Sequence, residues 1–204
     1  MIAIIDYGVG NLFSLKSSFS AIGEDAVVTN NVQTIKDAKK IILPGVGAFE
    51  DAAKKLQESG MQEVLLNEVK KGKTVMGICL GMQLLFDESY EFGVHKGLSL
   101  INGKIVGFEG KIPKEYLIPH IGWNALKLYN NSPIFKYLKD GDYVYFVHSY
   151  YAECDKKNVI ATSDYGKEFT AAVQNENVFG CQFHPEKSGD VGLNILKAFC
   201  EMGD

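Results

Sequence analysis

The chain has 204 residues, a formal net charge of −4, and a composition that is 46% hydrophobic and 23% charged. This balance is typical of a globular protein rather than a disordered one, and the lack of a long basic run gives no indication of nucleic acid binding. No apolar run approaches the roughly 18 residues that a bilayer-spanning helix needs, so we expect no membrane contact. A strand-like run at residues 2–6 stands where a secretory leader would be, which favours a cytoplasmic protein.

The N-terminal part of the chain alternates between apolar β-like runs and amphipathic helical patterns. Strands are expected at residues 2–6, 26–29, 40–43 and from 73, and helices at residues 12–22, 34–39, 48–59 and 61–71. Such alternation predicts a parallel sheet with right-handed crossover connections. Sites in parallel sheets form at the carboxyl ends of the strands, so we expect the loops at residues 7–11, 44–47 and 77–81 to share one edge.

Two of these loops contain paired glycines. Gly8 and Gly10 match the start of a dinucleotide-binding motif, but Phe13 stands where the third glycine belongs, so a strand-to-helix turn is the favoured interpretation. Gly45 and Gly47 bracket a single valine, which predicts a flexible peptide at the end of the third strand.

After about residue 86 the pattern changes to short β-like runs separated by Gly, Asn, Asp and Lys. They lie at residues 98–101, 103–108, 123–128, 143–151, 159–163, 169–174 and 178–183. Because no long helical pattern separates them, these runs predict an antiparallel or mixed section that is fused to the first sheet. A closing helix is expected at residues 190–202, and we expect a single domain over residues 1–204 because the sequence contains no linker or repeat.

The stretch from residue 73 to residue 86 passes from an apolar β-run into an apolar helical run, with Cys79 between them in the frame Gly77-x-Cys79-x-Gly81. This frame has the form of a nucleophile elbow, in which flanking glycines let the backbone bend sharply. The bend sets the cysteine at a helix N-terminus, where unpaired N–H groups and the helix dipole favour thiolate over thiol. A buried structural cysteine needs no such glycines, so we interpret Cys79 as a nucleophile.

The remaining cysteines, Cys154, Cys181 and Cys200, are scattered and form no C-x-x-C pair. Neither a disulfide framework nor a structural zinc site is therefore expected. Cys181 lies three residues before His184, but a metal site would need two further ligands that the sequence does not supply. We expect neither a metal nor a cofactor.

A cysteine nucleophile needs a base to take its proton, commonly a histidine that a carboxylate orients. His184 follows an apolar strand and precedes a proline, so His184 and Glu186 extend from one rigid segment with their side chains on the same side. The alternative is a histidine that makes one backbone hydrogen bond at a strand end; the Cys79 elbow favours catalysis. The other histidines are expected to be structural: His95 in a solvated loop, and His120 and His148 beside local backbone groups.

Acyl transfer through a thioester also needs hydrogen-bond donors for the developing oxyanion. The backbone N–H of Leu80, directly after the nucleophile, is one candidate. Val46 or Gly47 is the candidate for the second donor, because the glycines of that loop let a peptide flip at small steric cost. The alternative is that this loop is only a tight turn.

Six blocks of the sequence together resemble the class I, triad-type glutamine amidotransferases, in the same order and over nearly the whole chain. The blocks are Asp6-Tyr7-Gly8-Val9-Gly10-Asn11-Leu12, Pro44-Gly45-Val46-Gly47-Ala48-Phe49, Gly77-Ile78-Cys79-Leu80-Gly81-Met82-Gln83-Leu84-Leu85, Pro119-His120-Ile121-Gly122-Trp123-Asn124, Phe146-Val147-His148-Ser149-Tyr150 and Gln182-Phe183-His184-Pro185-Glu186-Lys187-Ser188. The cysteine elbow and the His-Pro-Glu segment identify the superfamily. Met82 and the Pro-His-x-Gly-Trp-Asn block resemble the sequences of the branch that supplies ammonia for histidine biosynthesis.

The resemblance implies a flavodoxin-like α/β fold, in which helices flank a central, mainly parallel sheet that has an additional antiparallel or mixed β section. It implies that Cys79 attacks the side-chain amide of L-glutamine, forming a thioester and releasing ammonia. His184 is then implied to transfer protons, and Glu186 to orient His184. The residues implied to hold the glutamine are Gln83, Ser149 and Tyr150.

The resemblance also implies a partner. In this branch the ammonia passes to a separate (β/α)8-barrel cyclase subunit, in a heterodimer, which makes imidazole glycerol phosphate and an aminoimidazole carboxamide ribotide. The positions that match partner-facing ones are Asn11, Trp123, Tyr145 and Lys187. Because free hydrolysis would waste glutamine, we expect the loop at residues 44–47 to withhold its oxyanion donor until the partner binds.

Three other functions fit parts of the sequence. A paralogous amidotransferase subunit would use the same chemistry to supply another synthase, for example in sugar amination. A cysteine hydrolase such as a γ-glutamyl peptidase would turn over without a partner. A flavodoxin-like binding module would have no use for an intact Cys, His and Glu set.

Overall fold

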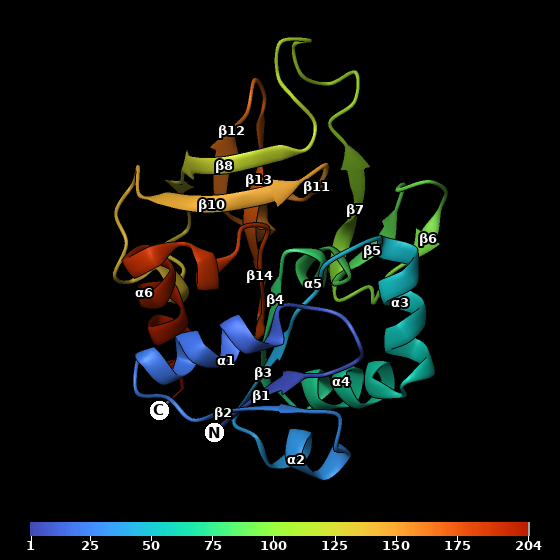
Figure 1. Ribbon diagram of the computed structural model, residues 1–204, viewed down its shortest axis with the longest axis vertical. Coiled ribbons are helices and arrows are strands. Elements are labelled where there is room, and N and C mark those ends of the chain that lie inside the picture. Colours follow the sequence, from blue (N-terminus) through green and yellow to red (C-terminus); the bar gives the residue numbers. More distant parts are fainter. Residues whose placement is uncertain (204) are drawn as a thin grey trace.

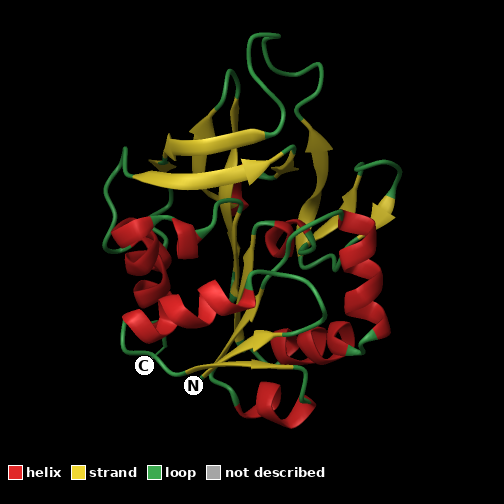
Figure 2. Cartoon of the chain, viewed as in Figure 1, coloured by secondary structure: helices red, strands yellow, loops and turns green. Residues whose placement is uncertain are grey.

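The computed structural model describes residues 1–203. Its centre is a mixed sheet of 12 strands, and a separate two-stranded ribbon crosses one end of that sheet (Figure 1). Figure 2 shows the sheet nearly edge-on, with helices on both of its sides. Within these residues no helix is long and apolar enough to cross a membrane.

The first half of the sheet is parallel, which confirms the prediction from the alternating pattern. Its strands are β1 (Ile2–Ile5), β2 (Ala26–Thr29), β3 (Lys40–Leu43) and β4 (Thr74–Ile78), and they lie in the order β2-β1-β3-β4. The helices between them are α1 (Leu12–Ala21), α2 (Val32–Asp37), α3 (Phe49–Glu58) and α4 (Met61–Lys70). Because the four strands run in one direction, their carboxyl ends share one edge of the sheet.

β1, β3 and β4 are almost wholly buried on both faces, which is why they read as mainly apolar runs, whereas in the edge strand β2 only Ala26 is buried. In β1, Ile2 and Ile4 join the core that α1 and α6 (Gly189–Cys200) cover, whereas Ala3 and Ile5 join the core beneath α3 and α4. α1 contacts α6 on one side of the sheet, and α4 contacts both α2 and α3 on the other side (Figure 1).

The second half continues the same sheet, as predicted, and is mainly antiparallel. β14 (Val178–Cys181) lies parallel to β4, and β13 (Glu168–Asn175), β11 (Tyr150–Cys154) and β7 (Ile101–Gly107) follow in antiparallel order. β5 (Phe86–Ser89) and β6 (His95–Lys96) complete that edge, while β12 (Val159–Asp164) and β9 (Lys127–Leu128) branch from β13. The connections contain the 3-10 helices η1 (Pro133–Phe135), η2 (Lys156–Asn158) and η3 (Pro185–Lys187).

The separate ribbon consists of β8 (His120–Ala125) and β10 (Tyr143–His148), which pair antiparallel. The single strand expected at residues 143–151 is therefore wrong, because the chain changes sheet at Ser149. β10 pairs with β8 in the ribbon, whereas β11 pairs with β7 and β13 in the main sheet.

The segment after the elbow also differs from the sequence prediction. Helix α5 covers only Leu80–Gln83, and Phe86 begins β5 instead of ending a helix. The carbonyl groups of Leu84 and Leu85 accept hydrogen bonds from the backbone of residues 98–101, so the strand expected there is a loop up to residue 100. The leucines have helical spacing, but they are buried because this loop packs over them.

His95 lies in β6 and not in the solvated loop that the sequence suggested. Its side chain is only 17% exposed, and Nδ1 lies 3.8 Å from Oε1 of Glu50 in the first turn of α3. The hairpin of β5 and β6 packs against α3 and encloses the ring, which is a contact between distant parts of the sequence.

The sharp bend at the end of β4 is made by Cys79 itself, whose φ of 54° and ψ of −113° are rare for a residue with a side chain. The flanking glycines do not take positive φ values; they allow backbone segments to touch. A Cβ on Gly77 would lie 2.6 Å from the carbonyl oxygen of Gly81, and a Cβ on Gly81 would lie 1.9 Å from the carbonyl oxygen of Leu43. Close backbone contact therefore holds the elbow in place.

The substitution Gly81→Ala is expected to lower the free energy of unfolding by about 3 kcal/mol, because the new Cβ meets backbone that no rotamer change can move away. Gly107→Ala is the matched control, since its Cβ would approach no atom closer than 3.4 Å, the nearest being in the ring of Tyr150. The control should change stability by less than about 1 kcal/mol. Urea denaturation of both variants measures the difference, and equal midpoints would contradict the account of the elbow.

Candidate active site

The carboxyl ends of β4, β10 and β14 surround a pocket of about 400 Å³. The residues that line it are Val46, Gly47, Cys79, Leu80, Gln83, Glu91, Pro119, Val147, His148, Ser149, Tyr150, His184 and Lys187. This set contains every residue that the sequence suggested for catalysis, oxyanion binding or substrate binding, except Glu186. The carboxylate of Glu186 lies behind His184, with its side chain only 1% exposed.

Cys79 lies between β4 and α5, with 8% of the residue exposed. Its backbone N–H donates to the carbonyl of Cys181 at 2.7 Å, which ties the elbow to the neighbouring strand β14. Leu80 is the first residue of α5, so its N–H belongs to the helix turn that has no intrahelical acceptor. A negative charge that develops beside Cys79 is therefore next to a backbone donor.

His184 and Glu186 form a rigid pair at the end of β14. His184 Nδ1 lies 2.7 Å from Glu186 Oε1, and the segment is fixed by the hydrogen bond from the His184 backbone N–H to Tyr145 O at 3.0 Å. His184 Nε2 is buried and makes no hydrogen bond within the described chain. Burial lowers the pKa of His184, but the interactions with Cys79 and Glu186 outweigh it and raise the pKa above its ordinary value of 6.5.

The loop after β3 is held at both ends. The Tyr7 hydroxyl donates to Pro44 O at 2.7 Å, and the backbone N–H of Phe49, which begins α3, donates to Glu91 Oε2 at 2.6 Å. Between these anchors Val46 is 43% exposed, and Gly47 has a φ of 93° with no atom within 4 Å of the place that a Cβ would take. The peptide between residues 46 and 47 is therefore the part of the loop with room to rotate.

One wall of the pocket includes the buried amide of Gln83, which bonds a second buried amide that does not itself line the pocket. Gln83 Nε2 donates to Tyr150 O at 3.2 Å and to Gln182 Oε1 at 3.0 Å. Ser149 lies at the junction of β10 and β11, where the chain changes from the ribbon to the main sheet. This change of sheet places the Ser149 backbone at the pocket. These groups are positioned to hold a small polar ligand beside Cys79.

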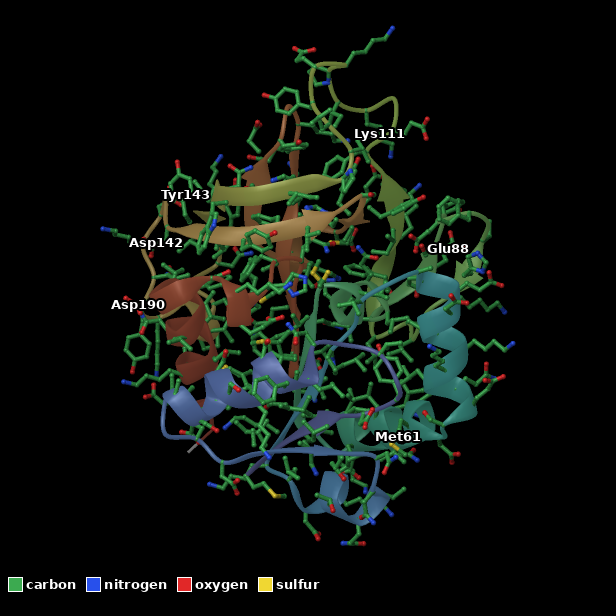
Figure 3. The ribbon with its side chains drawn as sticks, viewed as in Figure 1. Met61, Glu88, Lys111, Asp142, Tyr143 and Asp190 are labelled. Carbon is green, nitrogen blue, oxygen red and sulfur yellow. The ribbon has the colours of Figure 1, made fainter. Side chains whose placement is uncertain are left out.

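Sequence reasoning missed Glu91. It lies in the hairpin between β5 and β6, which ends beside the start of α3; Glu88 marks β5 in Figure 3. One carboxylate thus caps α3 and also lines the pocket. No local pattern marks the residue, because its role depends on a hairpin that the sequence did not predict. The same holds for Tyr7 and Gln182, whose contacts are with distant segments.

Of the residues suggested for a partner, Lys187 lines the pocket, whereas Asn11, Trp123 and Tyr145 are not among its lining residues. Trp123 and Tyr145 are opposite each other in the ribbon, with ring centroids 6.1 Å apart, and Lys187 Nζ lies 5.9 Å from the Tyr145 ring. Trp123 is 54% exposed. Asn11 precedes α1, which contacts η3, the turn that contains Lys187. Tyr143 lies at the outer end of the same ribbon (Figure 3).

His120 and His148 form a buried pair, and His148 also lines the pocket. His148 Nδ1 lies 2.8 Å from Tyr150 O, which agrees with the expected bond to a local backbone group, whereas His120 Nδ1 faces His148 Nε2 at 3.1 Å. Burial lowers the pKa of His120 to about 4 and that of His148 to about 3. Within residues 1–203 no group of three His, Cys, Asp or Glu side chains is placed to hold a metal ion.

The arrangement suits acyl transfer. A thiol at a helix start, an imidazole aligned by a buried carboxylate and a peptide with freedom to turn its N–H inward are the parts of a nucleophile, its base and an oxyanion site. All three meet in one pocket with polar groups beside them.

Comparison with known proteins agrees with an acyl-transfer site. A family model described as glutamine amidotransferase class-I matches residues 3–202. The chain is 50% identical to the imidazole glycerol phosphate synthase subunit HisH of Caldanaerobacter subterraneus subsp. tengcongensis, over 99% of this chain and 98% of the relative. It is 48% identical to the protein of that name from Methanothermobacter thermautotrophicus, over 99% and 98%. It is 45% identical to the protein of the same name from Wolinella succinogenes, over 100% of both chains.

Solved structures share the fold at low sequence identity. A glutamine amidotransferase crystal structure superposes with a TM-score of 0.74 at 17% identity, over 98% of this chain and 100% of that one. The structure of PurLQS from Thermotoga maritima gives a TM-score of 0.73 at 20% identity, over 98% and 96%. These likenesses confirm the predicted fold class.

We expect the ring of His184 to titrate above pH 6.5, while the rings of His120 and His148 stay neutral between pH 5 and 8 (about the range over which an ordinary histidine changes charge). In Cys79→Ala the pKa of His184 should fall, because one of the two interactions that oppose burial is lost. Proton-detected NMR of the imidazole rings measures all three. A His184 ring that titrates at or below 6.5 in the unaltered chain would contradict this electrostatic account.

Proposed function

The chain belongs to the class I glutamine amidotransferase family, among the HisH subunits of imidazole glycerol phosphate synthase, and we propose that it hydrolyses glutamine through a thioester on Cys79. It is the glutaminase subunit of that synthase, an enzyme of histidine biosynthesis. The observation that carries the proposal is that Cys79 and His184 line one pocket, with Glu186 bonded to His184 from behind. The proposal treats residues 1–204 as one catalytic domain that works in the cytoplasm.

In the first step the Cys79 thiolate attacks the side-chain amide carbon of glutamine, and the carbonyl electrons move onto the oxygen. His184 gives a proton to the amide nitrogen as the C–N bond breaks, which releases ammonia and leaves the thioester. His184 then takes a proton from water, the water oxygen attacks the thioester carbon, and glutamate leaves with Cys79 restored. Glu186 holds the imidazole in one orientation through both steps, from 2.7 Å away.

The substrate is held by opposite charges and by amides. Glu91 presents a carboxylate to the pocket, which suits the α-ammonium group of glutamine. Both N–H groups of Gln83 are used by Tyr150 O and Gln182 Oε1, so its own amide oxygen is the atom left to accept from a ligand. The backbone of Ser149 and Tyr150 lines the same wall. We assign substrate binding to these four residues.

The oxyanion is stabilised by two backbone donors in this proposal. Leu80 gives one from the first turn of α5, and the peptide between Val46 and Gly47 gives the other after it rotates. The anchors at Pro44 and Phe49 confine the change to that peptide. If the N–H of this peptide faces the oxyanion only when the second subunit is bound, the rate of glutamine hydrolysis depends on that subunit.

The partner in this proposal is the other subunit of the synthase, a (β/α)8-barrel cyclase that receives the ammonia in a heterodimer. The exposed ring of Trp123, with Tyr145 and Lys187, forms an aromatic and cationic surface beside the pocket mouth. Aromatic residues are enriched at protein interfaces, and the apolar stem of a lysine side chain can cover apolar surface while its charge stays in water. A partner on this surface would also cover the route by which ammonia otherwise reaches solvent.

The experiment that tests the reaction compares two nitrogen sources in the reconstituted synthase. Cys79→Ala should lose glutamine-dependent turnover by at least about 10³-fold, because the nucleophile is gone. Turnover with free ammonia should be unchanged, because the cyclase subunit uses ammonia directly. Loss of both activities would mean that Cys79 has a structural role, and retention of both would remove it from the mechanism.

The loop proposal predicts that the chain alone hydrolyses glutamine more slowly than the complex with cyclase and synthase nucleotide, by about 10²-fold or more, the cost of one missing oxyanion donor. Gly47→Ala should reduce the stimulated rate, since alanine disfavours its φ of 93°. Gly60→Ala carries similar strain at a φ of 74°, also in open space, but far from the pocket, and should leave stimulation unchanged. Equal rates for the chain alone and the complex would contradict a switch.

A further inference from the structure

Gln182 is a fully buried side chain at the end of β14, two residues before His184, and it is not among the residues that line the pocket. The proposed mechanism gives it no part. Its Nε2 nevertheless lies 3.8 Å from the sulfur of Cys79, and its Oε1 accepts from Gln83 at 3.0 Å. A buried amide between the nucleophile and a substrate-binding residue calls for an explanation, because polar groups are costly to bury without a purpose or a partner.

The hydrogen-bond network decides which end of the amide faces the sulfur. Tyr150 O can only accept, so the Gln83 atom 3.2 Å from it is the nitrogen. The same nitrogen faces Gln182 at 3.0 Å, so the Gln182 atom there must be the oxygen. The nitrogen of Gln182 is left to face Cys79. The direction of every bond in this row follows from one backbone carbonyl.

We propose that Gln182 is a positioning residue that donates an N–H to the Cys79 sulfur and holds it as an anion between the amide and His184. A donor favours the thiolate over the thiol, because a thiolate accepts a hydrogen bond far better than a neutral thiol does. The contact at 3.8 Å also limits the rotation of the cysteine side chain, and through Gln83 it links the sulfur to the residue that receives the substrate. This role rests on the proposed glutaminase function and adds a residue to it.

Several titratable groups surround Cys79 and remain in place when Gln182 is changed. His184 and Glu186 come from the β14–η3 segment, and Tyr7 follows β1, where burial and then the charge of Cys79 raise the pKa of its hydroxyl. The other titratable residues that line the pocket are Glu91, His148, Tyr150 and Lys187. A change in thiolate formation in a Gln182 variant therefore reports the amide, provided that these groups are kept.

The test is the pH dependence of iodoacetamide alkylation of the full chain, followed separately for each cysteine by peptide mass spectrometry. Gln182→Glu keeps the acceptor for Gln83 and replaces the N–H that faces Cys79 with an oxygen. The pH at which Cys79 is alkylated at half its maximal rate should rise by at least about one unit. At any pH below that midpoint, alkylation should therefore be about tenfold slower. Gln182→Met removes both bonds without adding a charge and should shift the midpoint in the same direction, which covers the case that the glutamate variant does not fold.

Gln174→Met is the matched control, because Gln174 is a glutamine on the neighbouring strand β13 whose side chain bonds Ser132 instead. Its profile should coincide with that of the unaltered chain. Coincident Cys79 profiles for Gln182→Met, Gln182→Glu and the unaltered chain would overturn the proposed role of Gln182. If Cys79 of the unaltered chain is alkylated no faster than the half-buried Cys154 at neutral pH, the proposed nucleophile itself fails, which is a different result.

Discussion

The elbow at Cys79 depends on backbone segments that approach more closely than any side chain allows. A Cβ on Gly45 would lie 2.5 Å from the amide nitrogen of Gly81, and one on Gly81 would lie still closer to the backbone of β3. The start of α5 and the loop after β3 are therefore in direct contact. The proposed nucleophile and the loop proposed to supply the second oxyanion donor therefore pack against each other at the level of the backbone.

The topology of the sheet places His184, the proposed base, beside this backbone contact. β14 comes late in the sequence but lies beside β4 in the middle of the sheet, with Cys181 opposite Ile78. Since the two strands are parallel, the segments that follow them emerge at the same edge. Cys79 follows one strand directly and His184 follows the other within a few residues, so strand pairing brings the proposed nucleophile and its proposed base to the same edge.

The parts that the sequence predicted well are those with local signals. β2 and β3 match at both ends because each is a short apolar and β-branched run between polar or glycine-containing segments, and the elbow and the His184–Glu186 segment have characteristic residues at fixed spacing. Glu91, Gln182 and Tyr7 have no such signal, since each acts through a bond to a distant segment. The helical pattern up to Phe86 was misleading because leucines beneath a folded-over loop have the same spacing as leucines on a helix face.

The central claim is that Cys79 forms a covalent bond with the substrate. The most direct measurement is the mass of the protein after acid quenching during steady-state turnover of glutamine, in the presence of the cyclase subunit and its nucleotide. The account predicts a fraction of the chain with one added γ-glutamyl group, located by peptide mapping on the peptide that contains Cys79 and absent in Cys79→Ala. Glutamate release at full rate with the adduct on another residue would contradict this claim. The claim would also be contradicted if a His184→Asn variant that still binds glutamine and turns it over slowly formed no adduct.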